Sequence, residues 1–189
     1  MSEGSVVYQI TVQTKKAETS LADAFDGARQ TVWFKGSDVR IDFGSLMLKQ
    51  ITLFDDATAS AVVLKEVGKE KYMMMLNAAQ WQHYNRKYDG LSYTYGNEEK
   101  TIAGYVCKQV TATLKDGSTM SIFYTPDVQP LTRQYDYAFR NLPGLALMYE
   151  VNTSGITLNY TATSVSFLAV NGANFDLPKS GYKILTYKP

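Results

Sequence analysis

The sequence predicts a mainly β protein: a single domain (residues 1–189) built on one large antiparallel sheet, curved or rolled, with helices on one side. Three observations favour it. Apolar and polar residues alternate with a period of two in many short runs, turn-forming clusters separate these runs, and aromatic residues make up 13% of the chain. A chain of 189 residues with 45% hydrophobic content can bury one sizeable core, and no repeat or flexible linker divides it.

The first half of the chain has the pattern of a meander of strands. A turn cluster at 36–38 joins two alternating runs and predicts a hairpin. Residues 19–25 fit a short helix or a structured loop equally well, since Leu21, Ala22, Ala24 and Phe25 follow possible N-cap residues. The strands expected here are 6–12, 31–35, 39–43, 46–54, 61–67 and 72–76.

The clearest helix begins after Asn77, a good N-cap residue, and is expected to end at Gly90. Trp81, Tyr84 and Tyr88 recur at spacings of three to four, which places them on one aromatic stripe. After this helix the strand pattern resumes, interrupted by one further helical turn at 133–141. The later strands are expected at 102–114, 119–124, 145–151, 156–163 and 165–170.

The charge pattern argues against a nucleic-acid partner, because 19 Lys and Arg balance 18 Asp and Glu and none form a basic run. No apolar run reaches the roughly 20 residues of a transmembrane segment. The N-terminus lacks the features of a signal peptide, which also fits a mature exported domain given a new initiator Met.

Residues suited to catalysis are few. His83 is the only histidine, and we expect it to be an exposed or groove-edge polar residue. Cys107 is the only cysteine, so it has no disulfide or zinc partner, and a buried position is expected for it. The carboxylate pairs at 55–56 and 98–99 fall in turn-like segments. We therefore expect no catalytic residue, no metal site, no cofactor and no enzymatic activity.

Residues 72–76 form an unusual apolar run with three consecutive methionines. As a strand, it would place Met73 and Met75 on one face and Met74 on the other. Flexible thioethers suit a hydrophobic groove, but a strand buried on both faces would explain the same pattern.

Several segments, in order, resemble the DUF4412 group of exported bacterial proteins of unknown function, which is related to the LolA/LolB-like lipoprotein-carrier fold. Residues 141–145 are also similar to the motif of the GLPGLI group, although Asn141 replaces its first glycine and Ala146 its isoleucine. The segments that carry the DUF4412 resemblance are 33–41, 71–72, 102–108, 121–125 and 175–182.

This resemblance implies a strongly curved antiparallel sheet that forms an open or unclosed barrel, with short helices covering its concave apolar face. It also implies export, to the periplasm or to the outer membrane. Such a face could shelter an acyl chain, since each methylene removed from water contributes about 0.8 kcal/mol and no catalytic residue is needed.

The leading hypothesis is therefore an envelope protein that binds a lipid, a lipoprotein acyl chain or another hydrophobic ligand. The alternatives are an envelope interaction module whose barrel is filled by its own side chains, binding through tyrosines such as Tyr93, Tyr95, Tyr135 and Tyr137, and a hydrolase with two facing carboxylates. The residues expected to bind the ligand are Trp33, Met73, Met75, Trp81, Tyr84, Phe139 and Leu142.

Overall fold

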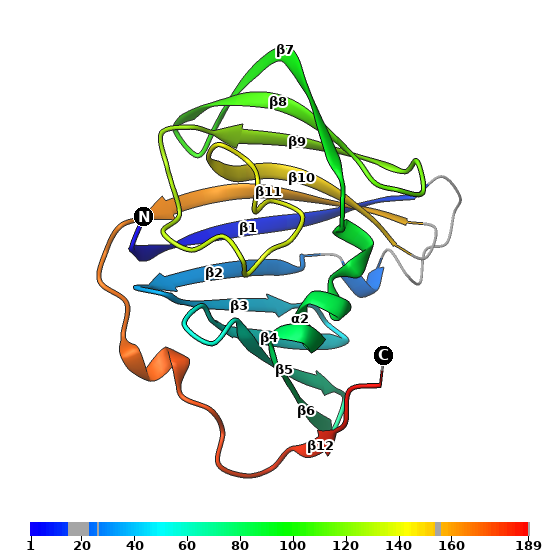
Figure 1. Cartoon of the computed structure of the whole chain (residues 1–189), viewed down its shortest axis with the longest axis vertical. Coiled ribbons are helices and arrows are strands. Elements are labelled where there is room, and N and C mark those ends of the chain that lie inside the picture. The colour runs from blue at the N-terminus through cyan, green and yellow to red at the C-terminus, as the bar shows by residue number, and fades with distance from the viewer. Residues whose placement is uncertain (15–22, 26, 154–155, 189) are drawn as a thin grey trace.

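The computed structural model describes residues 1–14, 23–25, 27–153 and 156–188. Twelve strands form one sheet in the order β12-β6-β5-β4-β3-β2-β1-β11-β10-β9-β8-β7 (Figure 1). Neighbouring strands are antiparallel, except for the parallel pair β12 and β6. The strands are β1 Glu3–Thr14, β2 Arg29–Lys35, β3 Asp38–Gly44, β4 Leu48–Asp55, β5 Ser60–Val67, β6 Glu70–Leu76, β7 Ser92–Ile102, β8 Tyr105–Thr113, β9 Thr119–Thr125, β10 Leu145–Thr153, β11 Ile156–Ser166 and β12 Lys183–Leu185.

The helical elements whose bounds the structure describes are short: the α-helix α2 (Ala78–Tyr84) and the 3-10 helices η1 (Arg86–Tyr88) and η2 (Gly172–Phe175). The sheet curves, and α2 lies over the same face as the connection from β9 to β10 (Figure 1). Among the described residues no ladder joins the edge strands β12 and β7, so the sheet is open. The predicted fold class, a mainly β protein with a curved antiparallel sheet and short helices, is confirmed.

The prediction of one strand over 102–114 is wrong. Residues 92–102 form a separate strand, β7, which pairs with β8 in a hairpin. The turn is made by Ala103 and Gly104, whose φ angles of 50° and 85° are typical of two-residue hairpin turns. The sequence did not predict this hairpin, because most of β7 is exposed and its side chains do not alternate in polarity along the strand.

Two further predictions, the helical turn at 133–141 and the separate strand at 165–170, are wrong. Residues 133–141 form a series of turns rather than a helix, with i to i+3 bonds such as the 2.9 Å one from the N–H of Leu142 to the carbonyl of Phe139. The strand expected at 165–170 does not exist as a unit, because β11 continues to Ser166 and the chain then leaves the sheet. Of the segment 19–22, nothing is described, but residues 23–25 are helical.

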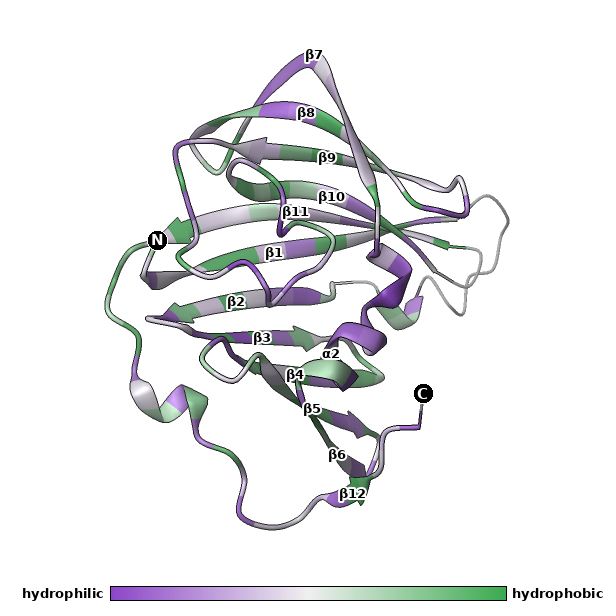
Figure 2. Ribbon diagram, viewed as in Figure 1, coloured by the Kyte–Doolittle hydropathy of each residue, from purple (hydrophilic) through white to green (hydrophobic). Residues whose placement is uncertain are grey.

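The sheet carries two hydrophobic clusters of unequal size. The larger one fills the concave face and includes Val6, Val32 and Phe34 from strands β1 and β2. The smaller one lies on the opposite, outer face of β4 to β6, and Phe175 and Tyr182 pack against it. Figure 2 shows hydrophobic stretches along β1, β9 and β10, and mostly hydrophilic residues along α2 and η1. The sheet is therefore covered on both faces, but by different segments.

Candidate functional site

The concave face is covered by the connection between β9 and β10, residues 126–144, which we call the covering loop (Figure 1). Its aromatic side chains pack onto the sheet. The ring of Tyr135 lies 5.5 Å from that of Phe34, and the ring of Phe139 lies 4.7 Å from that of Tyr149, both in edge-to-face geometry. These contacts, rather than any regular secondary structure, position the covering loop.

Polar side chains give the covering loop its shape. The amide of Gln129 donates 2.9 Å hydrogen bonds to the carbonyls of Pro126 and Pro143, which joins the two ends of the loop. The guanidinium of Arg133 donates to the carbonyl of Leu142 and to the side-chain oxygen of Gln129. Because backbone carbonyls in a non-helical loop need other partners, these two side chains substitute for secondary structure.

Gly144 closes the covering loop where the chain re-enters the sheet. A Cβ atom at this position would lie 2.0 Å from the backbone oxygen of Thr125, so only glycine permits the close approach. The segment 141–145, which resembles the GLPGLI motif, therefore has a structural role here.

Helix α2 adds the second part of the cover. Asn77 and Gln80 form a capping box at its start, as the sequence predicted for the N-cap. Trp81 is the buried residue of the helix, with its ring 5.9 Å from that of Phe54 in the sheet. The indole N–H of Trp81 donates a 3.1 Å hydrogen bond to the carbonyl of Gln134 in the covering loop. Trp81 therefore connects the helix, the sheet and the loop.

A cavity of about 190 Å³ remains between the sheet, η1 and the covering loop. We call it the inner cavity. Its walls come from five strands and from the two covering segments, and they are mostly aromatic or aliphatic. The lining residues are Gln30, Ile41, Tyr88, Met120, Asp136, Ala138, Phe139, Tyr149, Val151 and Tyr160.

Asp136 is the one carboxylate that lines the inner cavity. Burial raises its pKa to about 6, although the 3.0 Å hydrogen bond from the N–H of Ala138 and the charge of Lys87 both act to lower it. Burial, and secondarily the charge of Asp136, raises the pKa of the phenols of Tyr88 and Tyr160. The inner cavity is therefore a chamber with aromatic walls that also presents phenol groups, the amide of Gln30 and a carboxyl group whose pKa is raised.

The sheet holds the tyrosines of this region in place by hydrogen bonds. The hydroxyl of Tyr149 accepts a 2.9 Å bond from the amide of Gln30. The hydroxyl of Tyr8, which lies just beyond the cavity, donates a 2.8 Å bond to the carbonyl of Ala146. The rings of Tyr149 and Tyr160 stack at 4.6 Å. Hydrogen bonds and ring stacking therefore fix the part of the wall that the strands form.

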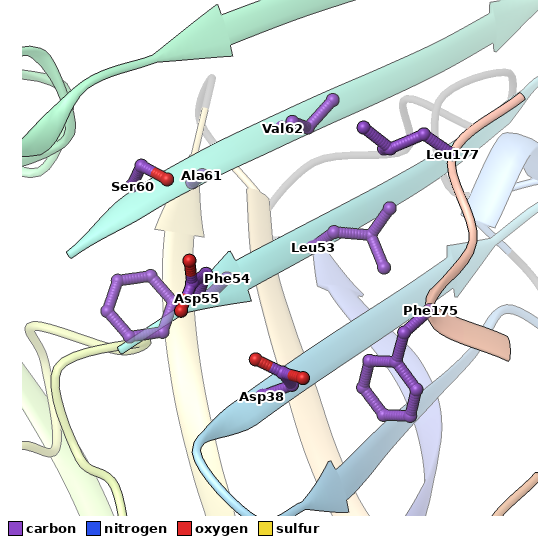
Figure 3. Close-up of a pocket in the computed structure, with 9 residues that line it drawn as sticks. All are labelled: Asp38, Leu53, Phe54, Asp55, Ser60, Ala61, Val62, Phe175 and Leu177. Carbon is purple, nitrogen blue, oxygen red and sulfur yellow. The ribbon is translucent and has the colours of Figure 1, made fainter. Parts of the chain in front are cut away.

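A second cavity, of about 310 Å³, lies on the outer face at the ends of β3, β4 and β5 (Figure 3). We call it the outer pocket. Its apolar walls include Leu53 and Val62 from the sheet and Phe175 and Leu177 from the C-terminal segment, with two carboxylates at one end. The remaining lining residues are Asp38, Phe54, Asp55, Ser60 and Ala61.

The seven residues predicted to bind a ligand do not share one site. Strand register places Trp33 opposite Arg40, Arg40 opposite Leu53, Leu53 opposite Val62, and Val62 opposite Met75. Because directly opposed residues point to the same face, Trp33 and Met75 lie on the outer face. Met73 lies on that face too, buried in the smaller hydrophobic cluster. These three residues cannot line a concave pocket.

The other four predicted residues belong to the concave side. Trp81 and Tyr84 stack with ring centroids 5.8 Å apart, and Leu142, in the covering loop, is fully buried. Phe139 alone lines the inner cavity. Whether any of the four contacts a ligand stays a prediction.

Sequence reasoning missed Asp136, Tyr149 and Tyr160. A carboxylate placed directly between two tyrosines, Tyr135 and Tyr137, was the available signal for Asp136. Tyr135 and Tyr137, suggested as surface residues for a partner, are buried. Their pairing across the covering loop with Phe34 and Trp81 explains why they turn inward.

The residues considered for catalysis have structural surroundings. The Nδ1 atom of His83 lies 2.6 Å from the hydroxyl of Tyr187. Cys107 is fully buried, and burial raises the pKa of its thiol to about 11, which suppresses the reactive thiolate. Within the described ranges no three His, Cys, Asp or Glu side chains gather around a common point. The helices of those ranges also include none long and apolar enough to cross a membrane.

Comparison with known proteins supports the fold. PNGF-II, solved in a C2 crystal form, matches 97% of this chain at a TM-score of 0.50 and 13% identity. MucB matches 94% of the chain at a TM-score of 0.47 and 13% identity. The beta-barrel-like DUF1849 protein from Brucella abortus matches 89% of the chain at a TM-score of 0.39 and 8% identity. This chain spans 31% of the PNGF-II chain, 58% of the MucB chain and 98% of the DUF1849 chain.

At 13% identity, the match to PNGF-II shows a shared fold and nothing about activity. No family model matches the chain, and no curated protein matches it. The resemblance to the DUF4412 and GLPGLI groups is therefore not confirmed, while the curved, mainly β architecture that it implied is the one observed.

Proposed function

We propose that this chain is a non-catalytic protein of the bacterial envelope that binds a hydrophobic ligand, such as a lipid or a lipoprotein acyl chain, against its concave face. The observation that carries the proposal is the inner cavity between an aromatic sheet face and a covering loop without regular secondary structure. Ligand sites of this kind are concave, mostly apolar and equipped with a few polar groups.

The size of the inner cavity shows what binding would require. Its 190 Å³ is below the roughly 300–1,000 Å³ of most ligand pockets and holds only about six groups the size of a water molecule. A longer acyl chain would need the covering loop to move outward. The loop is suited to this, since its attachments to the sheet and to α2 are ring contacts and isolated hydrogen bonds rather than strand pairing.

Native mass spectrometry of protein purified from a membrane-containing lysate tests the proposal. We expect a lipid-sized mass that is lost on denaturation. A variant with Trp33 replaced by phenylalanine then leaves Trp81 as the sole tryptophan, whose fluorescence should change when lipid moves the covering loop. A chain that carries no adduct and ignores added lipids would contradict the proposal.

A filled cavity provides the matched control. Ile41→Trp adds a large side chain to the wall of the inner cavity, whereas Ile184→Trp adds the same group to β12, where Ile184 is 64% exposed. Only Ile41→Trp should remove the bound lipid, with both variants retaining the β-sheet circular dichroism of the parent. Equal binding by both variants would place the ligand elsewhere.

A second candidate function is an envelope interaction module. Most of the concave face is occupied by its own side chains, and one rim of the sheet exposes Leu131, Phe167 and Leu168. These residues lie near one another, because the N–H of Leu131 bonds to the carbonyl of Met1, and Gly4 of β1 lies against Ser166. Leu168→Asp should then abolish association with a protein partner while leaving lipid binding unchanged.

A further inference from the structure

The outer pocket is formed where the C-terminal segment folds back across the ends of β3, β4 and β5 (Figure 3). Residues 167–188, which we call the C-terminal strap, pass over the outer face, pair with β6 through β12 and then reach α2, where Tyr187 contacts His83. Phe175 and Leu177 of the strap face Leu53 and Val62 of the sheet across the pocket. The pocket is thus an apolar cleft with one wall made of non-sheet chain.

The strap is attached on both sides of this wall. The guanidinium of Arg40 donates to the carbonyl of Asn174, and the hydroxyl of Tyr182 donates a 2.5 Å hydrogen bond to Glu66. Leu177 lies between these attachments and is 44% exposed. Its side chain can therefore shift to admit a ligand without releasing the strap.

Two carboxylates lie at one end of the outer pocket. Asp38 and Asp55 are directly opposite each other in the β3–β4 ladder, a position in which like charges repel. Burial, and secondarily the charge of Asp55, raises the pKa of Asp38. Neither carboxylate takes part in an ion pair with the described part of the chain: Lys35, opposite Asp38 in the β2–β3 ladder, is paired with Glu3, and Arg40, two residues along β3, is paired with Asp42. Asp55 accepts hydrogen bonds from the N–H of Ala57 and the hydroxyl of Thr58, which leave its negative charge in place.

A compensating cation would relieve this repulsion, and the pocket walls indicate its chemistry. A bare metal ion would need several further oxygen ligands, whereas the only other polar side chain of the lining is the Ser60 hydroxyl, opposite Asp55, and the remaining walls are apolar. Apolar walls beside an anionic end match a molecule that is cationic at one end and apolar along its body.

We propose that the outer pocket binds a small amphiphilic amine, with its ammonium group at the Asp38–Asp55 pair and its short apolar chain against the walls. At about 310 Å³, the pocket holds roughly ten groups the size of a water molecule, which fits an alkylamine of six to eight carbons. This site is separate from the inner cavity, on the other face of the sheet.

Titration with hexylamine, followed by NMR and calorimetry, tests the proposal against hexanol and hexanoate, which share its chain but lack the cation. We expect saturable binding of hexylamine that weakens at high salt, and at least tenfold weaker binding of both controls. Equal binding of hexanol, or binding of Ca²⁺ without binding of hexylamine, would overturn the proposal.

Matched variants locate the site. Asp38→Asn should weaken hexylamine binding about tenfold or more. Asp56→Asn removes the same charge from the β4–β5 turn, at a residue that does not line the pocket, and should leave binding within about twofold. If both variants lost hexylamine affinity equally, the change in net charge would explain the effect, and the proposal would be overturned. Ile41→Trp, which fills the inner cavity, should not change hexylamine binding, so failure of the lipid proposal and failure of this one can be told apart.

Discussion

The two faces of this sheet are covered in different ways. On the concave face, the covering loop and α2 contribute aromatic rings that join those of the strands in one large hydrophobic cluster. On the outer face, the C-terminal strap packs Phe175 and Tyr182 against a cluster of four buried residues. Strand β4 lies between both covers and is buried along 51–54 on both faces. We therefore expect the free energy of unfolding to depend mainly on the concave side and to change little when the outer side is altered.

The polar groups of the two faces follow the same division. Asp136 sits among tyrosines beneath the covering loop, where burial dominates its pKa. Asp38 and Asp55 sit at an open end of the sheet, where burial, and secondarily the charge of Asp55, raises the pKa of Asp38. Protonation is therefore the property to test for the carboxylate on the concave side, and binding of an added cation the one to test for the pair on the outer side.

The two tryptophans give the largest expected contrast. Trp81→Ala removes a buried ring and its hydrogen bond to Gln134, which should lower the free energy of unfolding by about 3–5 kcal/mol. Trp33→Ala on the half-buried outer face should cost only about 1 kcal/mol. Chemical denaturation monitored by circular dichroism measures both. Similar losses would show that the outer face contributes as much as the concave one.

The pH dependence of stability tests the burial of Asp136. Its pKa of about 6 in the folded chain is above the ordinary 3.8, so the folded state binds the proton more tightly. The free energy of unfolding should therefore fall as pH rises from about 4 to 6 and stay low above pH 6. At about 1.4 kcal/mol per pKa unit, the loss is at most about 3 kcal/mol. It should be smaller than this limit because Asp136 is partly exposed.

Asp136→Asn should remove this contribution and raise stability at pH 7, while its side-chain oxygen can still accept from Ala138. Asp116→Asn is the control, because hydrogen bonds from Ser118 lower the pKa of that exposed carboxylate and its contribution has the opposite sign. Denaturant midpoints measured from pH 4 to 7 distinguish the variants. An unchanged pH profile for Asp136→Asn would show that this carboxyl is solvated.

Deletion of one hydroxyl on each face gives the smallest contrast. Tyr8→Phe leaves the buried carbonyl of Ala146 without its donor and should cost about 1–2 kcal/mol. Tyr182→Phe removes the bond to the more exposed Glu66 and should cost under about 1 kcal/mol. Thermal unfolding of the two variants side by side measures the difference. A larger loss of stability for Tyr182→Phe would mean that the attachment of the strap contributes more to folding than its few contacts indicate.

The elements that the sequence predicted well share a local cause. The hairpin of β2 and β3, the N-cap at Asn77 and the opposite orientations of Met73 and Met74 depend on neighbours within a few residues. Strand β7 escaped prediction because nothing covers most of its side chains, so they have no reason to alternate in polarity. Strand β12 escaped because three exposed residues carry no pattern of their own.

The candidate site was predictable only in part, for a related reason. Large aromatic and methionine side chains signal burial, but the sequence does not say on which face. Trp33 and Met75 were therefore grouped with Trp81, although the ladder register separates them by the thickness of the sheet. Asp136 was missed since its proximity to Tyr149 and Tyr160 exists only after the covering loop folds onto β10 and β11.

The sequence by itself determined the mainly β class, most strand positions and the scarcity of catalytic side chains, because these follow from local periodicity and composition. Only the tertiary structure decided which face each strand presents, which segments cover those faces and where cavities remain. Those features depend on contacts between residues far apart in the chain, such as Trp81 with Gln134 and Arg40 with Asn174. No local pattern encodes such contacts, since their energies arise when separate segments pack together.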